Sequence, residues 1–166
     1  MNIAAVVGNP KAASRTLDAA QMLAKKIDPT IDPLVIDVAE LKDGLFGWGS
    51  ESVKSLISSV CACDLVVFAS PTYKASYTGL LKLFLDLFPA NGLAGVIAVP
   101  LMLGAGPGHA LAPEILLKPV LVELGATCPT KALYLLDSAY GDGVVMDEWL
   151  AIAAPQISAL MGSHAG

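Results

Sequence analysis

The sequence has few charged residues of either sign and no cluster of positive ones. Its 166 residues include ten Lys and Arg against fifteen Asp and Glu, and the formal net charge at pH 7 is −5. A surface that binds nucleic acid needs a dense patch of basic side chains. The scattered lysines and arginines therefore exclude nucleic acid as an expected partner.

Long hydrophobic runs are also absent, although 55% of the residues are hydrophobic. Gly, Pro or a charged residue interrupts each apolar run before it reaches the roughly 20 residues that span a bilayer. No basic leader precedes the apolar segment at Ile3. We therefore expect a cytoplasmic protein with no membrane-bound segment. The apolar content predicts one globular domain, residues 1–162, and a disordered tail, residues 163–166.

Cysteine and histidine are too dispersed in the sequence to form a metal site. Cys61 and Cys63 form a C-x-C pair at an expected helix end, and Cys128 lies far along the chain. A structural zinc site needs four Cys or His ligands. The aspartates Asp64 and Asp137 are isolated, without the spacing of a calcium loop. We expect buried thiols and no bound metal.

Apolar runs alternate five times with helical patterns, which is typical of β-α-β units and a parallel sheet. The expected strands are residues 3–7, 33–38, 65–70, 95–103 and 132–136. The expected helices are residues 14–26, 51–62, 77–88, 113–124 and 147–160. The fold class is therefore α/β, with helices on both faces of a five-stranded sheet.

Two of these helices, residues 77–88 and 113–124, are apolar around most of their circumference. Such helices need cover on two sides, and only one side can be the sheet. We expect a second subunit to provide the other cover, in a homodimer or homotetramer. The alternative is that the end segments of the same chain fold over them.

The segment after the first strand, Gly8 to Thr16, has the composition of a phosphate-binding loop. It combines backbone N–H groups at a helix start with two hydroxyls and the cations Lys11 and Arg15. It lacks the glycines of a P-loop or of a dinucleotide-binding loop, so a single terminal phosphate suits it better. The alternative is that Ser14 only caps the helix while both cations stay solvated.

Two further loops follow the third and fourth expected strands. They contain Ser70 to Lys74, and the small residues Gly104 to Gly106 before His109. In a sheet of order 2-1-3-4-5, all three loops converge beside the switch point of the topology. The sequence therefore predicts a site for a planar ligand that carries a phosphate, with Tyr73 facing the ligand or packing on the sheet edge.

Residues 70–87, SPTYKASYTGLLKLFLDL, resemble the signature of the NAD(P)H-dependent FMN reductases of the flavodoxin-like superfamily. GNPKAASRT at residues 8–16 and LKPVL at residues 117–121 extend the resemblance, which is closest to the reductases of two-component alkanesulfonate monooxygenases. It implies a flavodoxin-like three-layer sandwich with strand order 2-1-3-4-5. It also implies FMN as cofactor, NADPH or NADH as hydride donor, and no catalytic side chain, because the flavin carries the chemistry.

The resemblance also implies which residues hold the cofactor. The FMN phosphate would be held by Asn9, Lys11, Ser14, Arg15 and Thr16. The ribityl chain and the isoalloxazine ring would be lined by Pro71, Thr72, Tyr73 and Lys74. The polar edge of the ring would be bordered by Gly104, Ala105 and Gly106.

One departure from the family pattern bears on the fate of the flavin. Ile115 stands where the alkanesulfonate-linked reductases carry a polar aromatic residue in a π-bulged helix, so we expect a regular helix here. A regular helix implies FMN that stays bound and passes electrons to a quinone, azo dye or free flavin. The rival interpretation is release of reduced FMN to a flavin-dependent monooxygenase. A non-catalytic flavin-binding or electron-carrier protein, and a subunit that has lost the ligand, are further alternatives.

Overall fold

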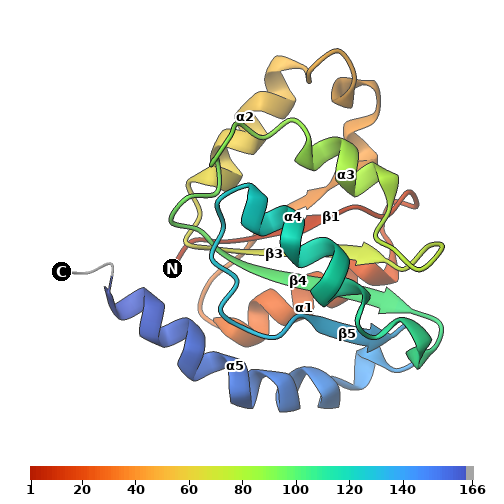
Figure 1. The fold of residues 1–166 in the computed structure, drawn as a ribbon, viewed down its shortest axis with the longest axis vertical. Coiled ribbons are helices and arrows are strands. Elements are labelled where there is room, and N and C mark those ends of the chain that lie inside the picture. The colour runs from red at the N-terminus through yellow and green to blue at the C-terminus, as the bar shows by residue number, and fades with distance from the viewer. Residues whose placement is uncertain (164–166) are drawn as a thin grey trace.

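The computed structural model describes residues 1–163 and has a parallel sheet between two layers of helices (Figure 1). The strands are β1 (Ile3–Val7), β2 (Leu34–Asp37), β3 (Leu65–Pro71), β4 (Ile97–Gly104) and β5 (Leu133–Leu136). Their order is β2-β1-β3-β4-β5, as predicted. The register aligns Val7 of β1 with Asp37 of β2 and Ala69 of β3, so these strands end at one edge.

The central strands are apolar on both faces because helices cover both faces. Every residue of β1, β3 and β4 is buried. This is the pattern expected of a parallel sheet, and it explains why these strands could be recognised as uninterrupted apolar runs.

The helices divide between the two faces of the sheet. They are α1 (Arg15–Ile27), α2 (Glu51–Cys61), α3 (Gly79–Leu85), α4 (Lys118–Glu123) and α5 (Val144–Ser163), with short 3-10 turns at η1 (Val38–Leu45), η2 (Pro107–His109) and η4 (Tyr140–Asp142). Figure 1 shows α2, α3 and α4 above the sheet and α1 and α5 below it. Two separate cores result, one on each face.

Helix α3 is shorter than the predicted span, residues 77–88. Thr78 caps its amino end, where Oγ1 accepts the N–H of Leu81 at 3.1 Å. At the other end, Pro89 disfavours a helical conformation for Phe88, and Leu87 and Phe88 bond three residues back instead.

The expectation of a regular helix around Ile115 is wrong. Residues Pro113–Leu117 form a π-helix, η3, in which the N–H of Lys118 bonds to the carbonyl of Pro113. Pro119 explains the wide turn, because proline has no N–H and its ring collides with the carbonyl four residues earlier, here that of Ile115. Pro119 therefore precludes the α-helical hydrogen bond to the carbonyl of Ile115, whichever side chain stands at position 115.

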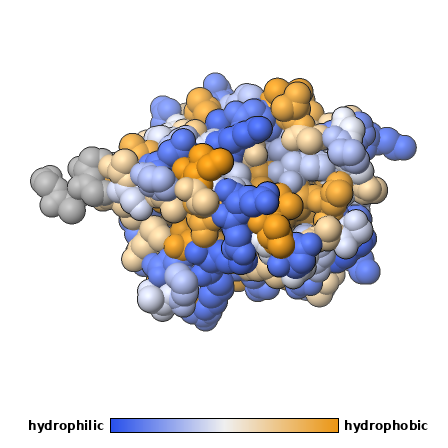
Figure 2. All heavy atoms as spheres, turned by 90° about the horizontal axis from the view of Figure 1, so that it is seen from below, coloured by the Kyte–Doolittle hydropathy of each residue, from blue (hydrophilic) through white to orange (hydrophobic). Residues whose placement is uncertain are grey.

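Helix α5 covers the face that also carries α1. It buries Met146, Ala153 and Ile157 against that core and begins at Val144, three residues before the predicted start. By length and composition, residues Val144–Met161 of α5 could cross a membrane, a test that the core helix of a soluble protein also passes. Figure 2 shows this face of the molecule, where apolar residues form separate patches among polar ones. The predicted tail lies outside the described residues except for Ser163, which ends α5.

Candidate flavin site

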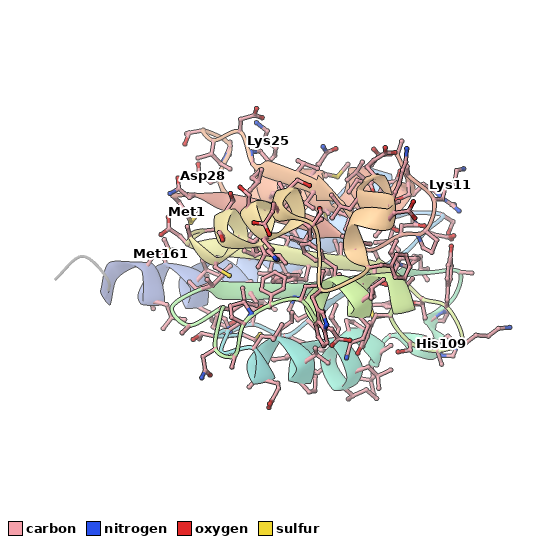
Figure 3. The ribbon with its side chains drawn as sticks, turned by 90° about the horizontal axis from the view of Figure 1, so that it is seen from above. Met1, Lys11, Lys25, Asp28, His109 and Met161 are labelled. Atoms are coloured by element: carbon pink, nitrogen blue, oxygen red, sulfur yellow. The ribbon has the colours of Figure 1, made fainter. Side chains whose placement is uncertain are left out.

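A cavity of 330 Å³ lies where the carboxyl ends of β1, β3, β4 and β5 meet. Figure 3 shows Lys11 and His109 at this end of the molecule, whereas Met1, Asp28 and Met161 lie at the opposite end. The cavity is lined by Asn9, Lys11, Ala13, Ser14, Arg15, Thr16, Asp18, Pro71, Thr72, Tyr73, Leu103, Gly104, Ala105 and Asp137. The predicted loops therefore do converge.

The loop between β1 and α1 forms the first wall of the cavity. The buried side chain of Asn9 stabilises this loop through hydrogen bonds. Asn9 is buried, its Oδ1 accepts the N–H of Lys11 at 3.0 Å, and its Nδ2 donates to Oγ1 of Thr16 at 3.1 Å. Both ends of the amide are thus engaged within the loop. A direct contact of Asn9 with a phosphate stays a prediction.

The start of α1 directs free donors toward the cavity. Oγ of Ser14 caps the helix by accepting the N–H of Leu17 at 3.3 Å, which leaves its own proton available. The N–H groups of Ser14, Arg15 and Thr16 have no acceptor among residues 1–163. Unpaired N–H groups at a helix start, together with the helix dipole, favour an anion.

The two cations of this wall differ in their surroundings. Arg15 bonds to Asp137 twice, through Nη2 to the carboxylate and through Nη1 to the backbone carbonyl, both at 3.2 Å. Lys11 forms no ion pair within the described part of the chain. Lys11 is therefore free to face a phosphate, whereas Arg15 would have to share its charge with Asp137.

Helix α3 holds the first wall, the loop after β1, against the second wall, which is the loop after β3. Thr78 Oγ1 donates to the carbonyl of Gly8, and a Cβ atom at Gly8 would lie 2.3 Å from Cβ of Leu81. Only glycine fits this contact between the loop and α3. The loops after β1 and β3 are thus held together through buried backbone contacts.

The second wall contains an unusual buried hydroxyl. Oγ1 of Thr72 is buried and has no hydrogen-bond partner among residues 1–163. It lies 3.2 Å from where a Cβ atom of Gly104 would be, and that atom would also collide with the hydroxyl of Tyr134 at 2.0 Å. Tyr134 in turn donates to the carbonyl of Gly106 at 2.7 Å. The absence of a side chain at Gly104 thus makes room for the Tyr134 hydroxyl, whereas the orphaned hydroxyl of Thr72 remains available to a polar group of a ligand.

The turn after β3 holds its residues in an uncommon conformation. Tyr73 and Ser76 exchange two backbone hydrogen bonds, and the residues between them, Lys74 and Ala75, both have left-handed φ angles, 51° and 66°. Neither is glycine, and such strain is concentrated at functional sites. The N–H groups of Lys74 and Ala75 have no acceptor within residues 1–163, nor have those of Ala105 and Gly106.

The structure gathers the predicted site residues with two exceptions. Lys74 and Gly106 do not line the cavity, although each adjoins a residue that does. Ala13, Asp18, Leu103 and Asp137 line it but were not predicted. Asp137 follows the end of β5, so the rule that pointed to the other strand ends could have found it.

Asp18 also changes the ionisation of a neighbouring tyrosine. The hydroxyl of Tyr140 donates to Oδ2 of Asp18 at 3.4 Å. Burial, and then the negative charge of Asp18, raise the pKa of Tyr140 above its usual value of 10.0. Tyr140 therefore stays neutral and donates its hydroxyl proton to Asp18. No three His, Cys, Asp or Glu side chains among residues 1–163 cluster as metal ligands would.

The family model of the NADPH-dependent FMN reductases matches residues 1–141, which include all three loops of the cavity. The chain belongs to this family. The match ends just before α5, so the shared part is the sheet with its first four helices.

Named members of the family are similar over much of the chain. An FMN reductase (NADPH) of Escherichia coli is 32% identical over 130 residues, which are 76% of this chain and 68% of that protein. An FMN reductase (NADPH) of Pseudomonas putida is 38% identical over 96 residues, 57% of this chain and 49% of that protein. The apo structure of an NADH:FMN oxidoreductase superimposes with a TM-score of 0.84 at 30% identity, covering 98% of this chain and 89% of the other.

The residues of the cavity fit FMN, the cofactor of the family. The free N–H groups at the start of α1, with the Ser14 hydroxyl and Lys11, suit a dianionic phosphate. The unpartnered Thr72 hydroxyl suits a polar atom at the edge of a flat ring. The two features lie in one cavity, as a ligand with a phosphate at one end and a ring at the other requires.

Proposed function

We propose that this protein is an NAD(P)H-dependent FMN reductase. The reaction oxidises NAD(P)H to NAD(P)⁺ and, with one proton from solvent, reduces FMN. The observation that carries the proposal is the single cavity that joins the free donors of α1 to the orphaned hydroxyl of Thr72. Relatives named for NADPH and for NADH leave both nicotinamides as donors.

The flavin, when bound, supplies the chemistry by accepting the hydride and giving up electrons again. The protein's residues bind the flavin and orient its ring. Ser14, Thr16 and Lys11 hold the phosphate, while Pro71 and Tyr73 form the wall beside the ring. Thr72 Oγ1 and the free N–H group of Ala105 would donate to the ring's polar edge. Donors fixed before the ligand arrives favour the added negative charge on a reduced ring.

We further propose that reduced FMN leaves the protein and serves a flavin-dependent monooxygenase. The expectation of permanently bound flavin depended on a regular helix around Ile115. Because residues Pro113–Leu117 form a π-helix, that expectation no longer has support. A quinone or azo reductase with tightly bound FMN is accordingly not favoured. A purely electron-carrying role is not favoured either, because the relatives are reductases.

The test is the visible spectrum of the purified protein and its oxidation of NADPH and NADH, without oxygen, before and after FMN is added. We expect protein that retains little flavin on gel filtration and oxidises the nicotinamide only when FMN is present. Bleaching of a flavin that co-purifies would show retained cofactor instead. Flavin binding without nicotinamide oxidation would contradict the proposed reductase activity.

A further inference from the structure

The phosphate loop contains a residue in the left-handed region of backbone space. Ala13, which lines the cavity, has a φ angle of 49°, a conformation that residues other than Gly, Asn and Asp rarely adopt. Ala13 immediately precedes the free N–H groups of Ser14, Arg15 and Thr16. The direction of these donors therefore depends on the turn at Ala13.

A carboxylate from the neighbouring strand holds this turn. Asp37 is the last residue of β2, and its Oδ2 accepts the N–H of Ala13 at 3.0 Å. Its Oδ1 accepts the N–H of Ala39 at 3.3 Å, which caps the turn η1. Asp37 itself is not among the residues that line the cavity.

We propose that Asp37 is a positioning residue for the FMN phosphate, an inference that rests on the proposed function. By bonding to the Ala13 N–H, Asp37 stabilises the left-handed turn that directs the next three N–H groups into the cavity. Its position beside an anion site supports this role. A carboxylate without a structural task would weaken phosphate binding through repulsion between like charges.

The alternative is that Asp37 only caps η1 and has no effect on the phosphate loop. The two roles predict different ligand behaviour, because riboflavin has the ring of FMN but lacks its phosphate. Loss of the phosphate turn should weaken FMN alone. Loss of η1, or a general loss of structure, should weaken both flavins or neither.

The experiment measures Kd for FMN and for riboflavin by quenching of flavin fluorescence, with Tm recorded for every variant. We expect Asp37→Ala to raise the Kd for FMN by about tenfold or more, equivalent to about 1.4 kcal/mol, and to leave that for riboflavin unchanged. Adding Ala13→Gly to Asp37→Ala should recover part of the FMN affinity, because glycine adopts positive φ readily. Asp37→Asn should lose less FMN affinity than Asp37→Ala, since its amide oxygen can still accept the Ala13 N–H.

Asp28→Ala is the matched control. Asp28 accepts a backbone N–H in the same way, from Thr30 at 3.0 Å, and its removal changes the net charge equally. It lies at the end of the molecule opposite to Lys11 (Figure 3), so neither flavin should be affected.

Unchanged or tighter FMN binding by Asp37→Ala would overturn the proposal, as would an equal loss for both flavins that Ala13→Gly does not recover. Wild-type protein that binds FMN but does not oxidise NAD(P)H would contradict the proposed reductase activity and leave the role of Asp37 standing. Wild-type protein that binds no FMN would overturn both.

Discussion

Two threonines carry the buried hydroxyls that lack a hydrogen-bond partner among residues 1–163, and they lie in different surroundings. Thr72 lines the candidate flavin cavity, whereas Thr130 precedes β5 and does not line that cavity. A buried hydroxyl without a partner destabilises the folded state, so each invites an explanation. For Thr72 that explanation is the ligand.

Thr72→Val should separate binding from stability. Valine has nearly the same shape without the hydroxyl, so we expect the ligand-free protein to gain up to about 1 kcal/mol of stability. FMN affinity should fall by a few-fold to about tenfold, because a ligand hydrogen bond is lost. Calorimetry of the ligand-free protein and flavin titration measure the two effects.

Thr130→Val is the control for this prediction. It removes the second unpartnered hydroxyl, so it should stabilise the protein in a similar way and leave FMN affinity unchanged. A Thr72→Val variant with wild-type affinity for FMN would remove Thr72 from the site.

At the residue scale, the sequence predicted which positions meet better than it predicted what each side chain does. Positions such as Ser14 and Thr72 follow strand ends, and strand ends are readable from apolar runs. The hydrogen bonds of the Asn9 side chain depend on the geometry of its loop. The bond from Arg15 to Asp137 joins residues more than 120 positions apart. Hydrophobic periodicity does not encode such contacts.

Among the elements, the π-helix η3 is the clearest case of this limit. Residues 113–124 were correctly predicted to be helical, but hydrophobic periodicity does not distinguish a π-turn from an α-turn over five residues. The missed signal was Pro119 within a helical pattern, which predicts a disturbed turn. The strands were predicted more closely, because apolar runs end sharply at polar or glycine residues.

Glu114 joins the π-helix to β5 and should make the stability of this junction depend on pH. Its carboxylate accepts the N–H of Ala132 and the ammonium of Lys118, both at 2.7 Å. Burial opposes ionisation, but the Ala132 N–H and Lys118 outweigh it and lower the pKa of Glu114 below 4.5.

The sign of the effect follows from this lowered pKa. The stabilisation from Glu114 is fully present above about pH 4.5 and is lost as pH falls through the lower pKa of the folded state. We expect Glu114→Gln to be less stable than wild type near neutral pH and to approach it on acidification. Urea unfolding at a series of pH values measures the difference.

Glu51→Gln serves as the comparison for this series. Glu51 pairs with Lys54 on the surface of α2, and its side chain is 90% exposed. Exposed pairs contribute little, so this variant should differ from wild type by less than about 1 kcal/mol throughout. A gap between Glu114→Gln and wild type that stays constant with pH would refute the role given to the Glu114 carboxylate.

On the scale of the whole molecule, the end segments do not cover the apolar helices. Helix α5 packs on the α1 face, and β1 enters the middle of the sheet. This rules out the alternative that the described chain ends fold over residues 113–124. Within residues 113–124 and just before them, the exposed large apolar side chains are Leu111, Ile115, Leu116 and Val122. A second face, on α5, exposes Val144, Val145 and Ile152.

We expect a homodimer or homotetramer that buries the first of these faces. Ile115 lies in the π-helix and Val122 in α4, and their side chains are 60% and 53% exposed. Ile115→Lys and Val122→Lys would each place a charge in a desolvated contact, which costs several kcal/mol when unpaired. Light scattering coupled to gel filtration should then show monomers where wild type shows dimers or tetramers.

Ile152→Lys distinguishes this face from the one on α5. Ile152 is 70% exposed, so lysine there should not disturb the fold, and the assembly should persist if α5 faces solvent. Dissociation by Ile152→Lys but not by Val122→Lys would move the interface to α5. A monomeric wild-type protein would show that the apolar face beside the π-helix has another purpose. If the assembly does bury the π-helix face, Pro119→Ala should weaken it while leaving Leu111, Ile115, Leu116 and Val122 unsubstituted, because the wide turn sets how Ile115 and Leu116 are presented.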